Sequence, residues 1–334
     1  MTLLLAVTTN AQNVDSSYVI EDGYIESMKK WVAPSLSFNN EYEIFEEREE
    51  DIRAILRPNI NTHLRLNFNY RFLAVGIQLV PQFLPGNGDD DIRGETRSFD
   101  LRARILTRRL NGDISYNRIQ GYYLANTEDF FQWEPGDPYV QFPDIVYSGV
   151  TLNLLYKFNN KFSYRNVINQ TERQLKSAGS FLPSVTFRYY TIDQSISVLN
   201  TNELLNIEAS AGPGYMHTFV FGKLFYLSMG AFGKVGYLHT RYRTGTPGQE
   251  QVESQNNLLI RLEGGAGLGY NGKRIFGGLY YTFSGSESEY RGEDSTTVNF
   301  NKRTRYTIFI GIRLNEPRFL GRLMDKVESL IPVL

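Results

Sequence analysis

Residues 56–71, LRPNINTHLRLNFNYR, alternate between apolar and polar side chains along almost their whole length. Successive side chains leave a β-strand on opposite faces, so this period of two predicts a strand. Strands of soluble sheets usually have about five or six residues, and a strand twice as long favours a barrel. The apolar positions are Leu56, Ile60, Leu64, Leu66, Phe68 and Tyr70, and the polar ones are Arg57, Asn59, Asn61, His63, Arg65, Asn67, Asn69 and Arg71.

The composition excludes several classes of protein. The 334 residues carry 35 Lys and Arg against 36 Asp and Glu, so nothing in the charge balance predicts a nucleic-acid partner. Mean hydropathy is −0.34 and no apolar run is long enough for a membrane helix. A transmembrane barrel stays compatible, because only half of each of its strands must be apolar. Cysteine is absent, which excludes disulfides and thiolate metal sites, and we expect no cofactor.

Alternating segments recur between residues 33 and 314 and predict an all-β fold, an antiparallel up-and-down transmembrane β-barrel. Outer-membrane barrels join their strands by short turns at one end and long loops at the other. This sorting favours twelve strands if 161–190 crosses once, and fourteen is the alternative if 191–205 hides a further crossing. The predicted strands are 33–45, 53–69, 73–84, 96–109, 112–124, 147–158, 161–171, 180–190, 206–218, 223–240, 257–270, 275–285 and 303–314, with long loops at 85–95, 125–146, 191–205, 241–256 and 286–302.

Both ends of the chain are predicted to lie outside the barrel. Residues 1–11 have the short apolar core and small residues of a signal-peptide remnant, or else form a frayed apolar terminus. Residues 12–32 form a periplasmic segment, with a short amphipathic helix over Asp22–Val32. Residues 315–334 place apolar side chains at helical spacing, which predicts a C-terminal amphipathic helix across the barrel mouth or in the membrane interface.

Four stretches carry a resemblance to a known family. They are YIESMKKWVAPSLSF at Tyr24–Phe38, RPNINTHLRLNFNYRFLAVGI at Arg57–Ile77, KFNNKFSYRNVINQTERQLKSAGSF at Lys157–Phe181 and AGPGYMHTFVF at Ala211–Phe221. Together they resemble an uncharacterised domain-of-unknown-function family of Gram-negative outer-membrane barrels. The resemblance implies a barrel in the outer membrane, and it implies no activity and no functional residues.

The polar faces of the predicted strands supply candidate residues for the lumen. Arginines outnumber acidic residues on these faces, so an open pore would favour anions. Alternatively, the charges pair with one another and fill the barrel. The candidates for lining the lumen or its mouth are Arg57, His63, Arg65, Asp100, Arg102, Arg104, Arg165, Glu172, Arg173, Arg261, Glu263, Arg303 and Arg305.

Other motifs predict little chemistry. Gly267–Lys273 fits a phosphate loop by spacing, but Arg274 and a strand follow where a Ser or Thr and a helix are required. The three histidines are far apart in sequence. The threonine that follows His217 and the one that follows His239 point to the opposite face of the strand, so neither pairs with its histidine. Pairing of His239 with Ser228 or Ser254 across strands stays open. We expect no catalytic, cofactor or metal site.

Three functions remain after these exclusions. The first is porin-like passage of small polar solutes through a polar lumen, and the second is a non-conducting barrel that serves as a scaffold or surface-binding module. The third is a lipid hydrolase with its site at the rim. In each case we expect the outer membrane as the location, with outer-membrane lipid and the barrel-assembly machinery as partners.

Overall fold

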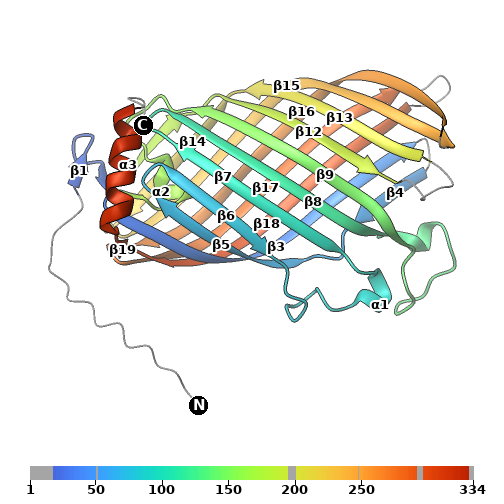
Figure 1. Ribbon diagram of the computed structural model, residues 1–334, viewed down its shortest axis with the longest axis horizontal. Helices are drawn as coiled ribbons and strands as arrows, with labels where there is room; N and C mark the ends of the chain where they lie inside the picture. The colour runs from blue at the N-terminus through green and yellow to red at the C-terminus, as the bar shows by residue number, and fades with distance from the viewer. Residues whose placement is uncertain (1–17, 50–51, 195–200, 247, 292–295, 331–334) are drawn as a thin grey trace, which may run out of the picture.

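The computed structural model describes residues 18–49, 52–194, 201–246, 248–291 and 296–330. In these residues twelve antiparallel strands close a ring, so the prediction of a twelve-stranded antiparallel barrel is confirmed (Figure 1). In order around the ring, the strands are β3 (Trp31–Glu49), β5 (Thr62–Tyr70), β6 (Leu73–Leu79), β7 (Arg97–Leu106), β8 (Leu110–Leu124), β9 (Gln141–Tyr156), β12 (Ser184–Asp193), β13 (Thr201–Gly212), β15 (Phe225–Thr246), β16 (Gln249–Asn271), β17 (Ile275–Arg291) and β18 (Thr296–Ile312), which pairs back with β3.

Two of these strands are interrupted by proline. Strand β11 (Ala178–Phe181) continues across Pro183 into β12, and β13 continues across Pro213 into β14 (Gly214–Phe221). Proline has no N–H for a ladder bond, so pairing breaks at these positions. Residues 178–193 therefore cross once. The strand predicted at 161–171 is wrong, because that segment contains helix α2 (Tyr164–Ile168), and the short strand β10 (Glu172–Gln174) follows it.

The predicted strand 53–69 is also two strands. Residues 58–61 separate β4 (Ile52–Arg57) from β5, and β4 pairs with β3 and then with β8, where Leu56 lies opposite Leu124. Leu56 packs against the inner cluster of Ile119 and Tyr147. The alternation therefore changes phase at the break, so Leu56 faces inward and His63 does as well.

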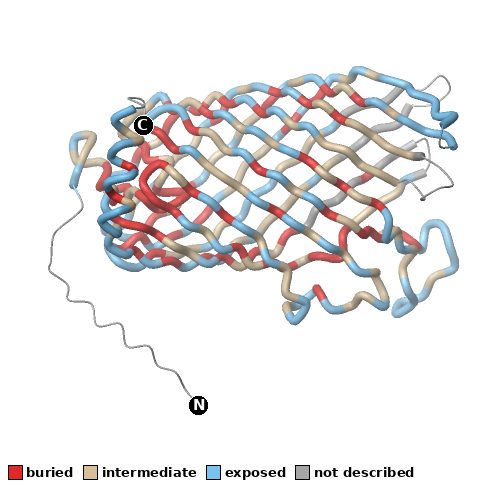
Figure 2. The backbone as a smooth tube through the Cα atoms, viewed as in Figure 1, coloured by how far each residue is buried: buried red, intermediate tan, exposed pale blue. Residues whose placement is uncertain are grey.

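One end of the barrel, which we call the turn end, carries the short connections and both terminal segments (Figure 1). Strands β1 (Tyr18–Ile20) and β2 (Ile25–Ser27) form a small sheet with β10 there. The chain then enters β3, so the helix predicted over Asp22–Val32 is wrong. Strand β19 (Leu314–Asn315) leads into helix α3 (Arg318–Leu330), as predicted. Buried residues concentrate at this end in Figure 2.

The opposite end, the loop end, carries the long hairpins and loops. Helix α1 (Asp90–Arg93) and the short helix η1 (Thr127–Asp129) lie in two of these loops. The loops predicted at 241–256 and 286–302 are largely strand, because β15 and β16 pair out to Thr246 and Gln249, and β17 pairs with β18 out to Arg291.

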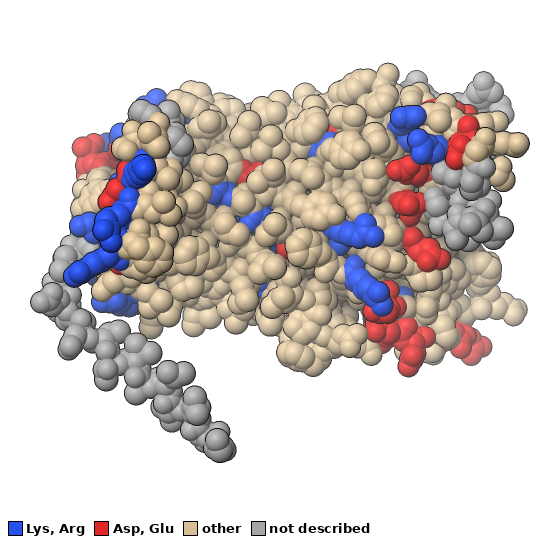
Figure 3. Space-filling view, viewed as in Figure 1, with Lys and Arg blue, Asp and Glu red and all other residues tan. Residues whose placement is uncertain are grey.

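The outer face of the barrel is apolar through its middle. Charged side chains gather mainly toward the two ends on the face drawn in Figure 3. No helix in the described ranges is long and apolar enough to span a membrane. The strand faces that point outward carry exposed apolar residues such as Leu66, Phe68, Leu101, Leu152, Leu154, Val185, Leu262, Ile308 and Ile310.

Candidate functional site

Three cavities follow one another along the lumen. The largest has a volume of about 480 Å³, and we call it the chamber. A cavity of about 30 Å³ lies on its loop-end side, and one of about 200 Å³ lies at the turn end. Arg303 lines both the small cavity and the chamber. Tyr164 lines both the chamber and the turn-end cavity, so these two side chains mark the partitions.

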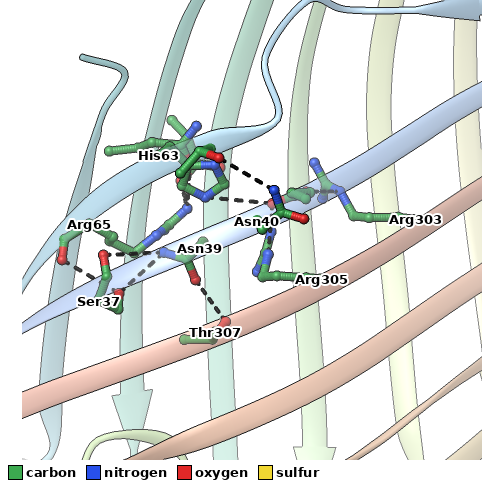
Figure 4. Close-up of polar contacts among 12 residues, drawn as sticks. Ser37, Asn39, Asn40, His63, Arg65, Arg303, Arg305 and Thr307 are labelled. Atoms are coloured by element: carbon green, nitrogen blue, oxygen red, sulfur yellow. Dashed lines mark hydrogen bonds and ion pairs between the residues drawn. The ribbon is translucent and has the colours of Figure 1, made fainter. Parts of the chain in front are cut away.

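The partition near Arg303 is a layer of ion pairs from strands β3, β5, β7 and β18 (Figure 4). Glu41 accepts from Arg305 at 2.7 Å and also pairs with Arg303. His63 Nε2 lies 3.7 Å from the same carboxylate. Arg65 pairs with Asp100 at 2.7 Å. Alternation places these side chains on the inner face of their strands, which brings residues far apart in sequence into one layer.

The chamber wall repeats this arrangement. Asp113 takes a 2.7 Å ion pair from Arg104 and a 3.7 Å pair from Arg102. Across the chamber, Lys234 lies 2.8 Å from Glu263 and donates to Thr186 Oγ1. The wall is therefore charged, with each carboxylate held by at least one cation.

A third cluster lies deeper in the wall. Glu208 is buried, and it pairs with Arg261 at 2.7 Å and with Arg188 at 3.3 Å. Around Asp113, Glu208 and Glu263, five cations share three carboxylates, which leaves an excess of positive charge in these clusters.

The turn end of the lumen is closed by residues 159–177 together with β1 and β2, which we call the plug. Ser163 caps α2 by accepting from the Asn166 N–H at 2.9 Å. Asn166 Oδ1 in turn accepts from Gln174 N and from Asn271 Nδ2 of the barrel. The plug is therefore a folded element, held by hydrogen bonds within itself and to the barrel, rather than a loose loop.

Two buried arginines tie the plug to the barrel. Arg313 donates to the carbonyls of Gln170 and Gly272 and to Asn271 Oδ1. Arg173 donates to the Asn271 carbonyl at 2.6 Å and pairs with Glu26 of β2. Both guanidinium groups thus hold plug and strand ends together.

Tyr164 is the side chain between the chamber and the turn-end cavity. Burial raises its pKa to about 12, so the phenol stays neutral at ordinary pH. On the turn-end side, burial lowers the pKa of Lys157, whose ammonium donates to the Phe162 carbonyl at 2.7 Å. The barrier is thus an uncharged ring with a cation beyond it.

A family described as a domain of unknown function, DUF4421, matches residues 14–314. The chain belongs to this family. No curated protein matches this DUF4421 protein.

Several solved outer-membrane proteins are similar to this DUF4421 protein. OmpT of Vibrio cholerae is 9% identical, with 82% of this chain and 97% of that chain covered and a TM-score of 0.33. The toluene transporter TodX of Pseudomonas putida is 10% identical over 86% and 90%, with a TM-score of 0.28. The translocator domain of the autotransporter NalP of Neisseria meningitidis is 5% identical over 84% and 88%, with a TM-score of 0.31. The barrel architecture rests on the ring of strands and its apolar outer face.

The structure distributes the predicted lumen residues of this DUF4421 protein over four places. Arg65, Arg102, Arg104, Glu263, Arg303 and Arg305 line the chamber. His63 and Asp100 line the small cavity, and Arg261 lies in the wall. Arg165, Glu172 and Arg173 belong to the plug, where Arg165 pairs with Glu172 at 3.6 Å.

Arg57 requires a correction. It does not line any of the three cavities, and its neighbour Leu56 packs on the inner cluster, so the phase change at 58–61 removes Arg57 from the predicted lumenal face.

Several lumenal residues escape the sequence reasoning. Glu41, Arg188, Glu208 and Lys234 lie within predicted strands, and their position on the polar face is the signal that would have found them. Asp113 is at the edge of a predicted turn, which hides it. Tyr164 lies in a segment predicted to be a strand, and nothing in its local pattern marks a barrier.

The histidines do not form a common site. His63 is buried in the lumen, whereas His217 and His239 lie on the outward faces of β14 and β15, with Phe219 and Tyr237 respectively. His239 Nδ1 lies 2.7 Å from Asn256 Oδ1, and Ser228 pairs with Thr218 inside the barrel. In the described part of the chain, no cluster of acidic and histidine residues could hold a metal ion.

Two glycines of the phosphate-loop match, Gly267 and Gly269, lie in strand β16. A Cβ at Gly267 would overlap the Tyr280 ring, and one at Gly269 would overlap the Tyr226 ring. The hydroxyls of these two tyrosines are 2.8 Å apart. These two glycines therefore let two aromatic rings lie against the strand.

Proposed function

We propose that this protein is an outer-membrane barrel that passes small polar solutes, with a preference for anions. The single observation that carries the proposal is the series of three cavities along a polar lumen, in which neighbouring cavities share a lining side chain. A chamber of about 480 Å³ suits small solutes. Outer-membrane lipid and the barrel-assembly machinery are its partners in this proposal.

The preference for anions follows from how the lumenal charges are shared. Asp113 balances only one of Arg102 and Arg104. In addition, the buried Nη1 of Arg65 has no hydrogen-bond acceptor in the described residues. Rings of cationic side chains favour anions in pores, so a solute carboxylate or phosphate would find surplus donors here.

Tyr164 is the proposed barrier to passage. The plug around it is fixed by Arg173 and Arg313, so displacing the whole plug would break many hydrogen bonds. Moving one neutral ring would join the chamber to the turn-end cavity. Passage would then end beside Lys157 and Arg165, which continue the positive path.

Planar-bilayer recordings test the proposal. Tyr164→Gly should raise single-channel conductance several-fold, and Tyr164→Phe, which keeps the ring, should match the parent protein. A salt gradient should give a reversal potential on the anion side. Replacing Arg102 and Arg104 by Gln should shift that potential toward cations, whereas lysine at both positions should preserve it.

A non-conducting binding barrel is the second candidate, and the hydrogen-bonded closure of the plug favours it. Silence of the parent protein and of Tyr164→Gly would reject passage. Saturable binding of a small anion in the same preparations, lost on replacing Arg102 and Arg104 by Gln, would then support the binding barrel.

A further inference from the structure

Helix α3 lies on the outer wall of the barrel at its turn end. Met324 packs against Val32, Tyr70 and Phe72, and Leu320 and Val327 border this cluster. Val32 lies opposite Tyr70 in the sheet, on the same faces of β3 and β5 as Leu36 and Leu66, which are exposed on the outside. Of the two positions predicted for the helix, the structure therefore excludes the one across the mouth.

Ion pairs fix the orientation of α3. The Arg71 guanidinium is 2.7 Å from Asp325, 3.2 Å from Glu316 and 3.3 Å from Glu328. Lys29 also pairs with Glu328, at 2.5 Å. Burial alone would lower the pKa of Arg71, but its hydrogen bonds to Asp325 and Glu316 outweigh this effect and raise the pKa. One charged cluster therefore anchors the barrel-facing side of the helix.

A second side of α3 is apolar and uncovered. Phe319, Leu323 and Leu330 are 69%, 54% and 72% exposed. At 100° per residue they lie within about 40° of one another around the helix axis. Arg318, Arg322 and Ser329 occupy the next sector. The helix thus has three sides, one against the barrel, one apolar and exposed, and one polar.

We propose that the apolar side of α3 lies in the membrane interface and contacts the phospholipid leaflet at the turn end. The inference rests on the proposed location of the barrel in the outer membrane. Amphipathic helices bury such a side about 5–10 Å into the boundary between headgroups and acyl chains. Arg318 and Arg322 then lie near the lipid phosphates, whose negative charge attracts cationic side chains.

Continuity with the barrel surface identifies lipid, rather than a protein, as the occupant. Ile312 and Leu314 are 46% and 49% exposed and immediately precede α3 in the chain. Ile105, at the turn end of β7, is 51% exposed on the outer face. The exposed side of α3 extends this apolar surface sideways. The helix therefore fixes the depth at which the turn end sits in the bilayer.

The absence of cysteine allows a direct test with single labels. Leu323→Cys, Ser329→Cys and Leu152→Cys are labelled with a fluorophore, and the folded proteins are reconstituted in vesicles whose phosphatidylcholine carries bromine at a shallow or a deep acyl position. We expect shallow bromines to quench the label at 323 at least twofold more than the one at 329. Leu152, on the outer face of β9, should be quenched by deep bromines.

The outcomes separate this inference from the proposed function. If 323 and 329 are quenched equally while 152 is quenched, the barrel is in the bilayer and the inference for α3 is wrong. Protection of 323 from both bromolipid and aqueous iodide would show a protein cover and would also overturn it. If 152 is not quenched, the membrane location itself fails. Heat-modifiable mobility on gels confirms that each variant is folded.

Discussion

Arginines in the plug and in the chamber are used in opposite ways. Arg313, in the plug contact, directs its donors at backbone carbonyls and an amide oxygen, which are neutral acceptors in fixed positions. Arg102 and Arg104 instead share one carboxylate, that of Asp113, beside the open volume of the chamber. The first arrangement holds two parts of the chain together. The second leaves an excess of positive charge beside the chamber. The position of an arginine along the lumen therefore decides whether it holds the plug in place or, in the proposed function, attracts the solute.

The largest expected effect comes from breaking the structural arrangement. Arg313→Met would leave the carbonyls of Gln170 and Gly272 and the Asn271 side chain without their donor. Each buried acceptor left unpaired costs roughly 1–3 kcal/mol, so the three together should lower the free energy of unfolding by about 3–9 kcal/mol. Urea unfolding followed by tryptophan fluorescence measures this loss, and bilayer conductance should rise as the plug loosens.

The matched control for that change is Arg305→Met in the lumen. Arg303 remains on Glu41 in this variant, so stability should change by less than about 1 kcal/mol. Equal losses in the two variants would remove the distinction between the two uses of arginine.

An arginine placed on the third surface, the outer face, tests the assignment of faces. Ile310 is 61% exposed, and Ile310→Arg should cost about 2–4 kcal/mol if the residue meets hydrocarbon. Thr307→Arg, on the same strand but lining the chamber, should assemble far better. Folding yield in liposomes reports both, and equal yields would mean that the faces are misassigned.

At Arg71 the ratio of cations to carboxylates is the opposite of that in the chamber, because three carboxylates share one guanidinium on the outer wall. Two of its partners are at least partly exposed, so Arg71→Met should cost only about 1 kcal/mol in barrel stability. Protease cleavage within α3 should nevertheless become faster. Unchanged cleavage would show that the apolar contacts of Met324 suffice for docking.

The smallest expected effect is the response of this contact to pH. The hydrogen bond from Arg71 lowers the pKa of Asp325 below its ordinary value. Its contribution is therefore fully present above about pH 4 and is lost as pH falls through the lowered pKa. Cleavage within α3 should stay constant from neutral pH down to that point and rise only below it, measured with an acid-active protease.

The sequence predicts the parts of this fold that depend on local periodicity. Residues such as Leu66, Leu152 and Ile310 face outward as their alternation predicts, because a period of two maps directly onto a sheet face. The short turns follow for the same reason. The single crossing within 161–190 follows from the sorting of short and long connections.

The remainder depends on contacts between distant segments. Residues 161–171 fit a strand locally, and their bonds to distant residues such as Asn271 and Arg313 hold them in the plug. Arg57 and Leu56 change faces because β4 finds a partner in β8, which no local pattern encodes. Likewise, the sharing of Asp113 by two arginines depends on strand register.

The pairing of β4 also sets the shape of the loop end. Since β4 bonds to β3 on one side and to β8 on the other, it bypasses β5, β6 and β7 there, and the described ring passes through ten strands instead of twelve. Barrel diameter grows with strand number, so the circumference of the barrel is smaller at the loop end. We call this ring of fewer strands at the loop end the neck of the barrel. Solutes would be sorted by size at the neck before any lumenal charge acts on them.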